Sequence, residues 1–387
     1  EELAEKAYAE RSAADAGSAL ADPGVTWTDT QKIKGYASQA SINVGESINF
    51  HISSNVPFYD LVVYRVGWYG GDGARWMAEA DHLAGTNYGI PAPDPVTGMV
   101  EAHWPVAYTL QTNSNWTSGI YLVWLTESGV NSNEVSYIIF VVRDDARVSD
   151  ILYQVPFTTY QAYNSWGGKS LYDYNSVDDR ASQVSFDRPY DHDDGSGLFF
   201  SGDYNMVRWM EKQGYDVTYT TSVDLDRNPN LMNNHKVFLS NFHDEYWSWN
   251  MFNNAQAARD QGKHLLFFDS NNIYWQIRFA PSSTGVAGRV IICYKNAATD
   301  PMSTSSTPWL TTVLWRDPPV NRPENALLGV MFQDAMGFGE NYPWVVTNAS
   351  HWFYEGTGLQ NGDTIPLLVG YEFDRVWNNG LTPANLE

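Results

Sequence analysis

Two short strings in this sequence carry the residue types best suited to chemistry. The first is His243–Trp247, with the sequence HDEYW, and the second is Asn271–Trp275, with the sequence NNIYW. An imidazole beside two carboxylates can accept and donate protons, so His243, Asp244 and Glu245 are candidate catalytic residues. The two strings are the first place to look for an active site.

The elements around these strings predict that they lie close together. Apolar runs at 236–240 and 264–268 precede the two strings and are typical of buried strands, and residues 249–262 between them are typical of a helix. A strand, helix, strand unit of this size forms two parallel strands with a right-handed crossover. Both strings therefore leave the carboxyl edge of one sheet, where open α/β sheets build their sites.

The rest of the sequence predicts a helical arm and two domains. Residues 1–22 are rich in Ala and Glu and are typical of a helix. Residues 23–145 hold short alternating strands separated by turns, which indicates an immunoglobulin-like β-sandwich without the usual Cys pair. Residues 146–387 alternate strands and helices and then end in short strands and long loops, which indicates a doubly wound α/β domain.

The composition limits the partners and the location that we expect. The 387 residues include 45 acidic and 23 basic ones, a formal net charge of −22, which repels nucleic acid and anionic membrane surfaces. No apolar run approaches the ~18 residues of a membrane span. Aromatic residues reach 15% while charged ones total only 18%, a mix that favours an extracellular or cell-surface protein, although no signal peptide is visible. The single Cys293 excludes an internal disulfide, and its apolar strand predicts a core residue.

Several longer strings resemble the N,N-dimethylformamidase large (beta) subunit-like family. The likeness covers about residues 33–387. The strings that carry it are Gly35–Ala40, Tyr64–Gly71, Tyr160–Ser170, Ser185–Tyr190, His243–Ser248 and Gly370–Arg375.

This resemblance implies a sandwich followed by a glutamine-amidotransferase-like α/β domain, and a mononuclear iron held by two tyrosines and one glutamate. The tyrosine-bearing strings match at Tyr246 and Tyr274. The glutamate segment, upstream of the Leu-Trp-Arg string, has Thr311-Thr312 in this sequence. The carboxylates that remain for the third position are Glu372, which we take as the candidate ligand, with Asp300 and Glu355 as alternatives.

Amide hydrolysis without a Ser or Cys nucleophile requires a Lewis acid, and anionic phenolate and carboxylate oxygens suit ferric iron. In that hypothesis His243, Asp244 or Glu245 is the general base, and Arg278 stabilises the oxyanion. The expected partners are a small amide substrate and either further copies of the chain or a small second subunit.

Structural interpretations stand beside each of these roles. Tyr246 and Tyr274 also fit core aromatics whose hydroxyls find partners. His243–Glu245 fits a helix N-terminus, where carboxylates satisfy free backbone donors. Arg278 fits an ion pair with Asp269 or Asp300, and Glu372 fits a buried ion-pair network.

Two further functions remain open at this point. One is a non-catalytic extracellular protein that binds glycan or self-assembles as a structural scaffold. The other is a hydrolase of the same fold that uses another metal or none.

Overall fold

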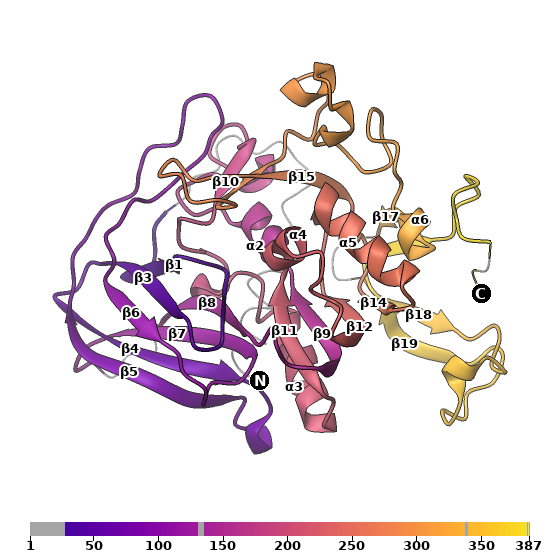
Figure 1. Cartoon of the computed structure of the whole chain (residues 1–387), viewed down its shortest axis with the longest axis horizontal. Helices are drawn as coiled ribbons and strands as arrows, with labels where there is room; N and C mark the ends of the chain where they lie inside the picture. The colour runs from indigo at the N-terminus through magenta and orange to yellow at the C-terminus, as the bar shows by residue number, and fades with distance from the viewer. Residues whose placement is uncertain (1–27, 131–134, 337–339, 385, 387) are drawn as a thin grey trace.

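The structure is a computed structural model that describes residues 28–130, 135–336, 340–384 and 386. The expected N-terminal helix at 1–22 therefore lies outside the described residues. Figure 1 shows an N-terminal half built of β-sheets, a mixed half built around a parallel sheet, and C-terminal ribbons at the far side of that sheet. The fold is thus all-β followed by α/β, as the sequence predicts at this level.

The N-terminal half consists of two sheets packed on one core. The alternating sequence of β4 turns Tyr59, Leu61 and Val63 into this core, where they meet side chains of the opposite sheet such as Phe50. One sheet contains β1 (Ile33–Ala37), β3 (Ser47–Ser54) and β6 (Tyr108–Gln111), in that order. The other sheet contains β2 (Ser41–Asn43), β8 (Ser136–Arg143), β7 (Gly119–Glu127), β4 (Phe58–Val66) and β5 (Ala74–Ala84), in that order.

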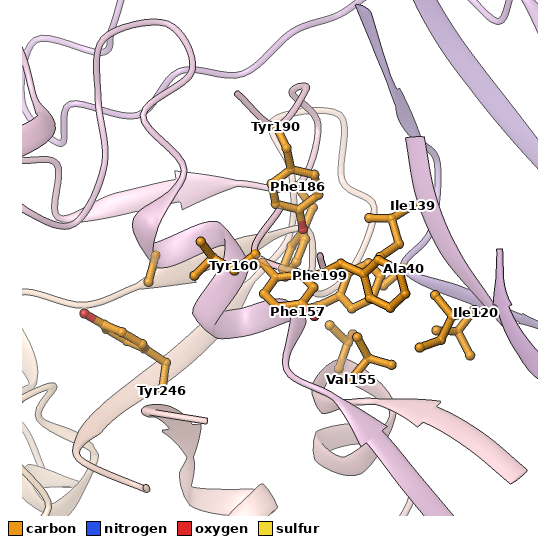
Figure 2. Packing of buried hydrophobic residues seen from close by; sticks show 14 of the residues in the cluster. Ala40, Ile120, Ile139, Val155, Phe157, Tyr160, Phe186, Tyr190, Phe199 and Tyr246 are labelled. Carbon is orange, nitrogen blue, oxygen red and sulfur yellow. The ribbon is translucent and has the colours of Figure 1, made fainter. Parts of the chain in front are cut away.

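The five-stranded sheet is covered on both faces, which explains why β8 is almost continuously apolar. Ile138 and Phe140 belong to the core between the two sheets, whereas Ile139 and Val141 belong to the core shared with the α/β half. Figure 2 shows this second core, with Ile139 among the aromatic rings. The two halves therefore share one extensive apolar contact.

The α/β half is built on four parallel strands in the order β11 (Val217–Thr221), β9 (Ser149–Val155), β12 (His235–Asn241) and β14 (His264–Phe268). The expected strand, helix, strand unit is present: α5 (Trp249–Asp260) joins β12 to β14. The Ser248 hydroxyl starts α5 by accepting a hydrogen bond from the Met251 amide at 3.1 Å. Both polar strings accordingly follow neighbouring strands at the same edge.

The strand order reverses at this edge, the arrangement at which open α/β sheets form a ligand-binding crevice. From β9 the chain moves outward to β11, and from β12 it moves outward in the other direction to β14. Open α/β sheets bind ligands where the order reverses in this way, which here is between the carboxyl ends of β9 and β12. The helix α2 (Phe157–Tyr163) follows β9, and the His243–Trp247 string follows β12.

Smaller elements surround this edge, and the sequence analysis did not predict most of them. A second sheet has the order β10 (Gln183–Ser185), β16 (Val290–Ile292), β15 (Trp275–Ala280) and β13 (Tyr246–Ser248). The C-terminal ribbons are β17 (Met331–Ala335) with β20 (Glu372–Arg375), and nested between them β18 (Tyr342–Val345) with β19 (Thr364–Val369). The remaining α-helices are α3 (Asp203–Gln213), α4 (Ser222–Arg227) and α6 (Asn325–Leu328).

None of the helices in the described part of the chain has the length and apolar character needed to cross a bilayer.

A buried ion pair joins the two halves. The Arg65 guanidinium on β4 donates to the Glu211 carboxylate on α3 at 2.7 Å, and Glu211 also accepts from the Trp68 amide and the Tyr219 hydroxyl. Removing one member leaves the other charge buried without its partner. We therefore expect Glu211→Gln to lower the free energy of unfolding by about 3 kcal/mol in urea titrations.

The matched control is Asp150→Asn, because Asp150 pairs with Lys236 at the exposed surface. That change should alter stability by less than about 0.5 kcal/mol. Equal effects of the two substitutions would contradict the assigned role of the Arg65–Glu211 pair.

Candidate functional site

The Glu245 carboxylate is the centre of a polar cluster at the crevice. Its Oε2 atom accepts hydrogen bonds from the Tyr163 hydroxyl at 2.8 Å and from the Tyr172 hydroxyl at 2.9 Å. The Nε2 atom of His243 lies 3.3 Å from the same oxygen and 3.1 Å from the Tyr163 hydroxyl. Glu245 is only 3% exposed, so nearly all of its interactions are with protein groups.

The backbone around Glu245 is held from both sides. The Glu245 amide donates to the Thr159 hydroxyl of α2 at 3.1 Å, and the Glu245 carbonyl accepts from the amides of Tyr274 and Trp275. The two polar strings are therefore directly bonded to each other.

Backbone strain gathers at the same edge. Phe242, Asn271 and Ile273 have φ values of 71°, 59° and 56°, although none of them is glycine. Such conformations persist only where the surroundings enforce them, and they concentrate at functional sites. Asn271 and Ile273 lie on the second string and Phe242 immediately precedes the first, so all three support a site at this edge.

The cluster stabilises a carboxylate beside neutral phenols. Burial alone would raise the pKa of Glu245, but the hydrogen bond and charge of His243, the Lys295 charge and the Tyr163 hydrogen bond hold that pKa below its usual value. Burial, followed by the negative charge of Glu245, raises the pKa of both Tyr163 and Tyr172 well above 10. The carboxylate is thus ionised, while the two phenols keep their protons.

Lys295 lies beside this cluster in a cage of aromatic rings. Its Nζ atom is 3.5 Å from the ring centroid of Tyr172, 4.8 Å from that of Trp275 and 5.2 Å from that of Tyr246. Burial lowers the pKa of Lys295 to about 8. The Tyr246 hydroxyl donates to the Tyr172 hydroxyl at 2.6 Å and so extends the network toward Lys295.

A cavity of about 460 Å³ opens beside this cage. Apolar side chains and one ammonium group together suit a small ligand that has an alkyl part and an oxygen acceptor. The cavity is lined by Trp275, Lys295, Asn296, Ala297, Val313, Leu314, Asp317 and Pro318.

The C-terminal ribbon brings Glu372 to the cluster. The Glu372 Oε2 atom is 3.7 Å from Nδ1 of His243, and its Oε1 atom accepts from the Asn271 amide group at 3.3 Å. His243 therefore has a carboxylate near each of its ring nitrogens. The structure brings together four of the predicted residues: His243, Glu245 and Glu372 directly, and Tyr246 through its bond to Tyr172.

Asp244 and Arg278 are engaged elsewhere. The Asp244 carboxylate accepts from Gln154 and Ser240, each at 2.6 Å, and burial raises its pKa to about 6. Arg278 forms two hydrogen bonds to Asp300, at 2.7 and 3.0 Å. These contacts support the structural interpretation of both residues, which the structure does not bring to the Glu245 carboxylate.

The structure does not pair Tyr246 with Tyr274, and the strand register explains why. Tyr246 on β13 stands opposite Trp275 on β15, so Tyr274 is offset by one residue and faces the other side. Within the described residues, no hydrogen bond or ring contact joins Tyr246 to Tyr274. Instead the Tyr274 ring packs on Phe332 with the Arg316 guanidinium 5.3 Å from its centroid. Figure 2 shows the Tyr246 hydroxyl pointing away from the neighbouring aromatic core.

The structure also shows the surroundings of Asp300 and Glu355, the alternative candidates for the third ligand. Asp300 accepts from Arg278, from Met302 and from the backbone and hydroxyl of Thr312, so its carboxylate is fully used. Glu355 is exposed beside the C-terminal ribbons.

The family model described as N,N-dimethylformamidase beta subunit-like, C-terminal, matches residues 60–387. The chain belongs to this family.

Two curated relatives are similar over a shorter stretch. The N,N-dimethylformamidase beta subunit of an Alcaligenes species is 29% identical over 134 residues, which is 32% of this chain and 17% of that protein. The protein of the same description from Paracoccus aminophilus is 29% identical over 131 residues, 31% of this chain and 17% of that protein. The matched stretch thus spans less than a fifth of either relative.

A solved structure of the Pseudomonas fluorescens alkylpurine DNA glycosylase AlkC, bound to DNA containing an abasic site analogue, also aligns. It has a TM-score of 0.17 and 19% identity, over 29% of this chain and 31% of that chain. A likeness this slight carries no argument about fold or function.

The geometry identifies two tyrosines and a lysine that the sequence analysis did not select. Two phenols and one carboxylate are the donor types that the family resemblance implies, and Tyr163, Tyr172 and Glu245 supply them at one point. Tyr163 lies in the Tyr160–Ser170 string, which was noticed only as a family signature. The available signal was its position just after β9, at the same sheet edge as His243.

A second buried acid fixes α2, the helix that carries Tyr163. The Asp203 carboxylate, at the start of α3, accepts from the hydroxyls of Tyr153 and Tyr160. Burial raises the pKa of Asp203 to about 7. The folded protein therefore binds this proton more tightly than the unfolded chain, in which an Asp has a pKa of about 3.9.

This difference predicts how stability depends on pH. Because the native state holds the extra proton, the Asp203 contribution is lost as pH rises from about 4 through about 7. Asp203→Asn mimics the protonated acid, so relative to the unmodified protein the variant should gain up to about 4 kcal/mol between pH 4 and pH 8. Urea titrations across that range measure the difference, with exposed Asp150→Asn as the control; parallel pH curves for Asp203→Asn and the unmodified protein would contradict the shift.

Proposed function

We propose that this chain is a metal-dependent hydrolase of carbon–nitrogen bonds in small amides, with Tyr163, Tyr172 and Glu245 as the ligands of an iron ion. Family membership supports amide hydrolysis as the reaction class. The observation that carries the site is the convergence of two phenol hydroxyls on one buried carboxylate, within 2.9 Å of the same oxygen.

The electrostatics of the cluster favour a trivalent cation. Two phenolates and one carboxylate carry three negative charges, which ferric iron would balance in a site that is largely removed from water. Burial and the Glu245 charge keep both phenols protonated when no cation is bound. Binding the ion therefore displaces two protons.

Iron bound here would supply Lewis acidity toward an amide carbonyl. The residues of the chain supply the other functions. His243 is placed to take up a proton at Nε2, and Glu372 stabilises the resulting imidazolium from the Nδ1 side. The Lys295 ammonium provides a hydrogen-bond donor beside the cavity for a substrate oxygen.

The cavity supports a substrate with a short alkyl group. Val313, Leu314 and Pro318 supply apolar lining to the cavity that Lys295 also lines, together with the polar Asn296 and Asp317. An amide of this kind places its carbonyl toward the polar side and its alkyl group toward the apolar side. The apolar contacts orient the substrate and exclude water.

The proposal extends to the domain types, the partner and the location of the chain. We infer an immunoglobulin-like domain at 23–145 and a doubly wound, glutamine-amidotransferase-like domain at 146–387, supported by the packed sheets and by the parallel strand order. The relatives are named beta subunits, which supports a second subunit as a partner. An extracellular or cell-surface location is supported by composition alone.

One observation favours a second candidate function. Trp352, Phe353 and Leu367 on the C-terminal ribbons are 73%, 61% and 70% exposed. Exposed apolar side chains of this size mark interaction surfaces. A non-catalytic protein that self-assembles through these ribbons would be metal-free and colourless and would form regular polymers.

Tyrosine substitutions test the iron ligands. Ferric iron bound to phenolate absorbs visible light, so natively purified protein should be coloured and should contain about one iron per chain. Tyr163→Phe and Tyr172→Phe should each remove much of this absorption and weaken iron binding by more than about 100-fold, because each deletes one oxygen ligand.

Tyr274→Phe is the matched control, since among the described residues the Tyr274 hydroxyl makes no hydrogen bond to Glu245 and its ring packs on Phe332. It should keep the colour. Loss of colour in Tyr274→Phe together with its retention in Tyr163→Phe would transfer the site to the other tyrosine and refute the assignment made here.

The pH dependence of iron binding tests the displaced protons. With two phenols deprotonated per ion, the apparent affinity should rise about 100-fold per pH unit between pH 5 and pH 7. Competition with a chelator of known pH dependence measures this slope. A slope of zero would mean that no phenol gives up a proton to the ion.

A further inference from the structure

Arg188 is a buried cation whose hydrogen bonds all go to uncharged oxygens. The side chain is 1% exposed. Nη1 donates to the carbonyls of Trp166 at 3.0 Å and Lys169 at 2.6 Å, and Nη2 donates to those of Asn164 at 2.9 Å and Gln161 at 3.5 Å. Nε donates to the side-chain oxygen of Gln161 at 3.3 Å.

Three of these acceptors belong to the segment that connects the two candidate tyrosine ligands, and the two on Gln161 belong to α2 just before it. Tyr163 ends α2, and Tyr172 begins the next short helical turn at Asp173–Asn175. The carbonyls of Asn164, Trp166 and Lys169 lie between the two tyrosines and turn toward the same guanidinium. The distance between the phenols thus depends on the path of this loop.

The loop adopts a backbone path that needs an internal support. Gly167 and Gly168 both have a φ of 78°, a conformation that L-residues with side chains rarely adopt. A Cβ atom added at Gly167 would lie 2.8 Å from a methyl group of Val100. The inward-facing carbonyls of Asn164, Trp166 and Lys169 need hydrogen-bond donors from outside the loop. The Arg188 guanidinium is that donor.

The planar shape of the guanidinium group suits the binding of several loop carbonyls. Its positive charge, in contrast, would normally be paired with a carboxylate. Its five N–H donors form a rigid planar fork that reaches several acceptors at once, which a lysine cannot do. Other buried arginines of the chain are paired with acids: Arg65 with Glu211 and Arg289 with Asp187. Burying a charge that donates only to neutral acceptors is costly, and burial lowers the pKa of Arg188 to about 10 although the Asp191 charge acts in the opposite direction.

We propose that Arg188 is a positioning residue for the candidate metal site: by binding the carbonyls between Tyr163 and Tyr172, it holds the two phenols at the spacing that lets both reach Glu245. This inference rests on the proposed function for the identity of the ion, but its effect on the loop does not depend on any ion.

Two measurements on Arg188→Lys test the proposal. In metal-free protein, hydrogen exchange should become faster in segment 163–172 while the sandwich strands exchange as before, because the loop loses its fork of donors. In ferric iron titrations, affinity should fall about 10- to 100-fold, the usual effect of a residue that orients metal ligands. The absorption maximum of the coloured form should also shift, because the phenolate geometry changes.

Arg65→Lys is the matched control. It replaces another buried arginine that donates to backbone carbonyls, but one located on β4 in the sandwich. It should lower stability without changing iron affinity, the absorption maximum or exchange in the loop. Equal iron affinity in Arg188→Lys and the unmodified protein would overturn the positioning role, as would unchanged exchange in the loop.

The design separates this inference from the proposed function. If the unmodified protein binds no iron, the proposed function fails, and hydrogen exchange alone still decides whether Arg188 orders the loop. If Arg188→Lys does not fold, Gln161→Met removes the side-chain acceptor of Nε, together with the hydrogen bond that the Asn164 amide group donates to the same oxygen. This milder change should shift exchange and iron affinity in the same direction by a smaller amount, and no change in either would refute the proposal.

Discussion

A negative charge buried at the end of two neighbouring strands is the constraint on which the rest of the site depends. An ionised carboxylate that is almost fully removed from water is stable only when hydrogen-bond donors surround it. Glu245 receives such donors from Tyr163 and Tyr172, with His243 at 3.3 Å. The two tyrosines come from the segment after β9 and His243 from the string after β12, so the fold must deliver both parts of the chain to one point. The Thr159 contact on α2, the loop bound by Arg188 and the register of β13 with β15 serve this requirement.

The sheet packing provides the rigid support that such a cluster needs. Strands β7 and β8 of the five-stranded sheet are apolar on both faces, so they join the sandwich core to the α/β core. Arg65 and Glu211 add a directed contact across the same boundary. The helices α2 and α3 are therefore fixed against the sandwich, and α2 in turn fixes Tyr163. A site built from several segments retains its geometry because those segments rest on one continuous core.

The sequence predicted the main elements well, because their hydrophobic periods are strong. The strand, helix, strand unit with β12, α5 and β14 is present, and so are the strands of the N-terminal half. The prediction that both polar strings leave one sheet edge is confirmed by the bonds between the Glu245 carbonyl and the amides of Tyr274 and Trp275.

The hydrophobic periods could not predict which tyrosines lie at Glu245, namely Tyr163 and Tyr172, and not the pair Tyr246 and Tyr274. A one-residue offset between Tyr246 and Tyr274 sends their side chains to opposite faces, and such a register is invisible in a single sequence. Tyr172 lies on a loop whose path depends on Arg188 and Gly167, which are distant contacts without a local pattern. Glu372 could be suggested only from the family likeness, since its position depends on the pairing of β20 with β17.

The late position of Glu372 in the chain has a consequence for how the protein matures. A ribosome releases α2 and the His243–Trp247 string well before it synthesises β20, so the nascent polypeptide can build the Glu245 cluster while the carboxylate beside Nδ1 of His243 does not yet exist. The His243 environment is therefore completed only after the C-terminal ribbon has emerged and docked. A chain interrupted before residue 372 would retain the sandwich and the parallel sheet. It would lack the Glu372 carboxylate beside Nδ1 of His243.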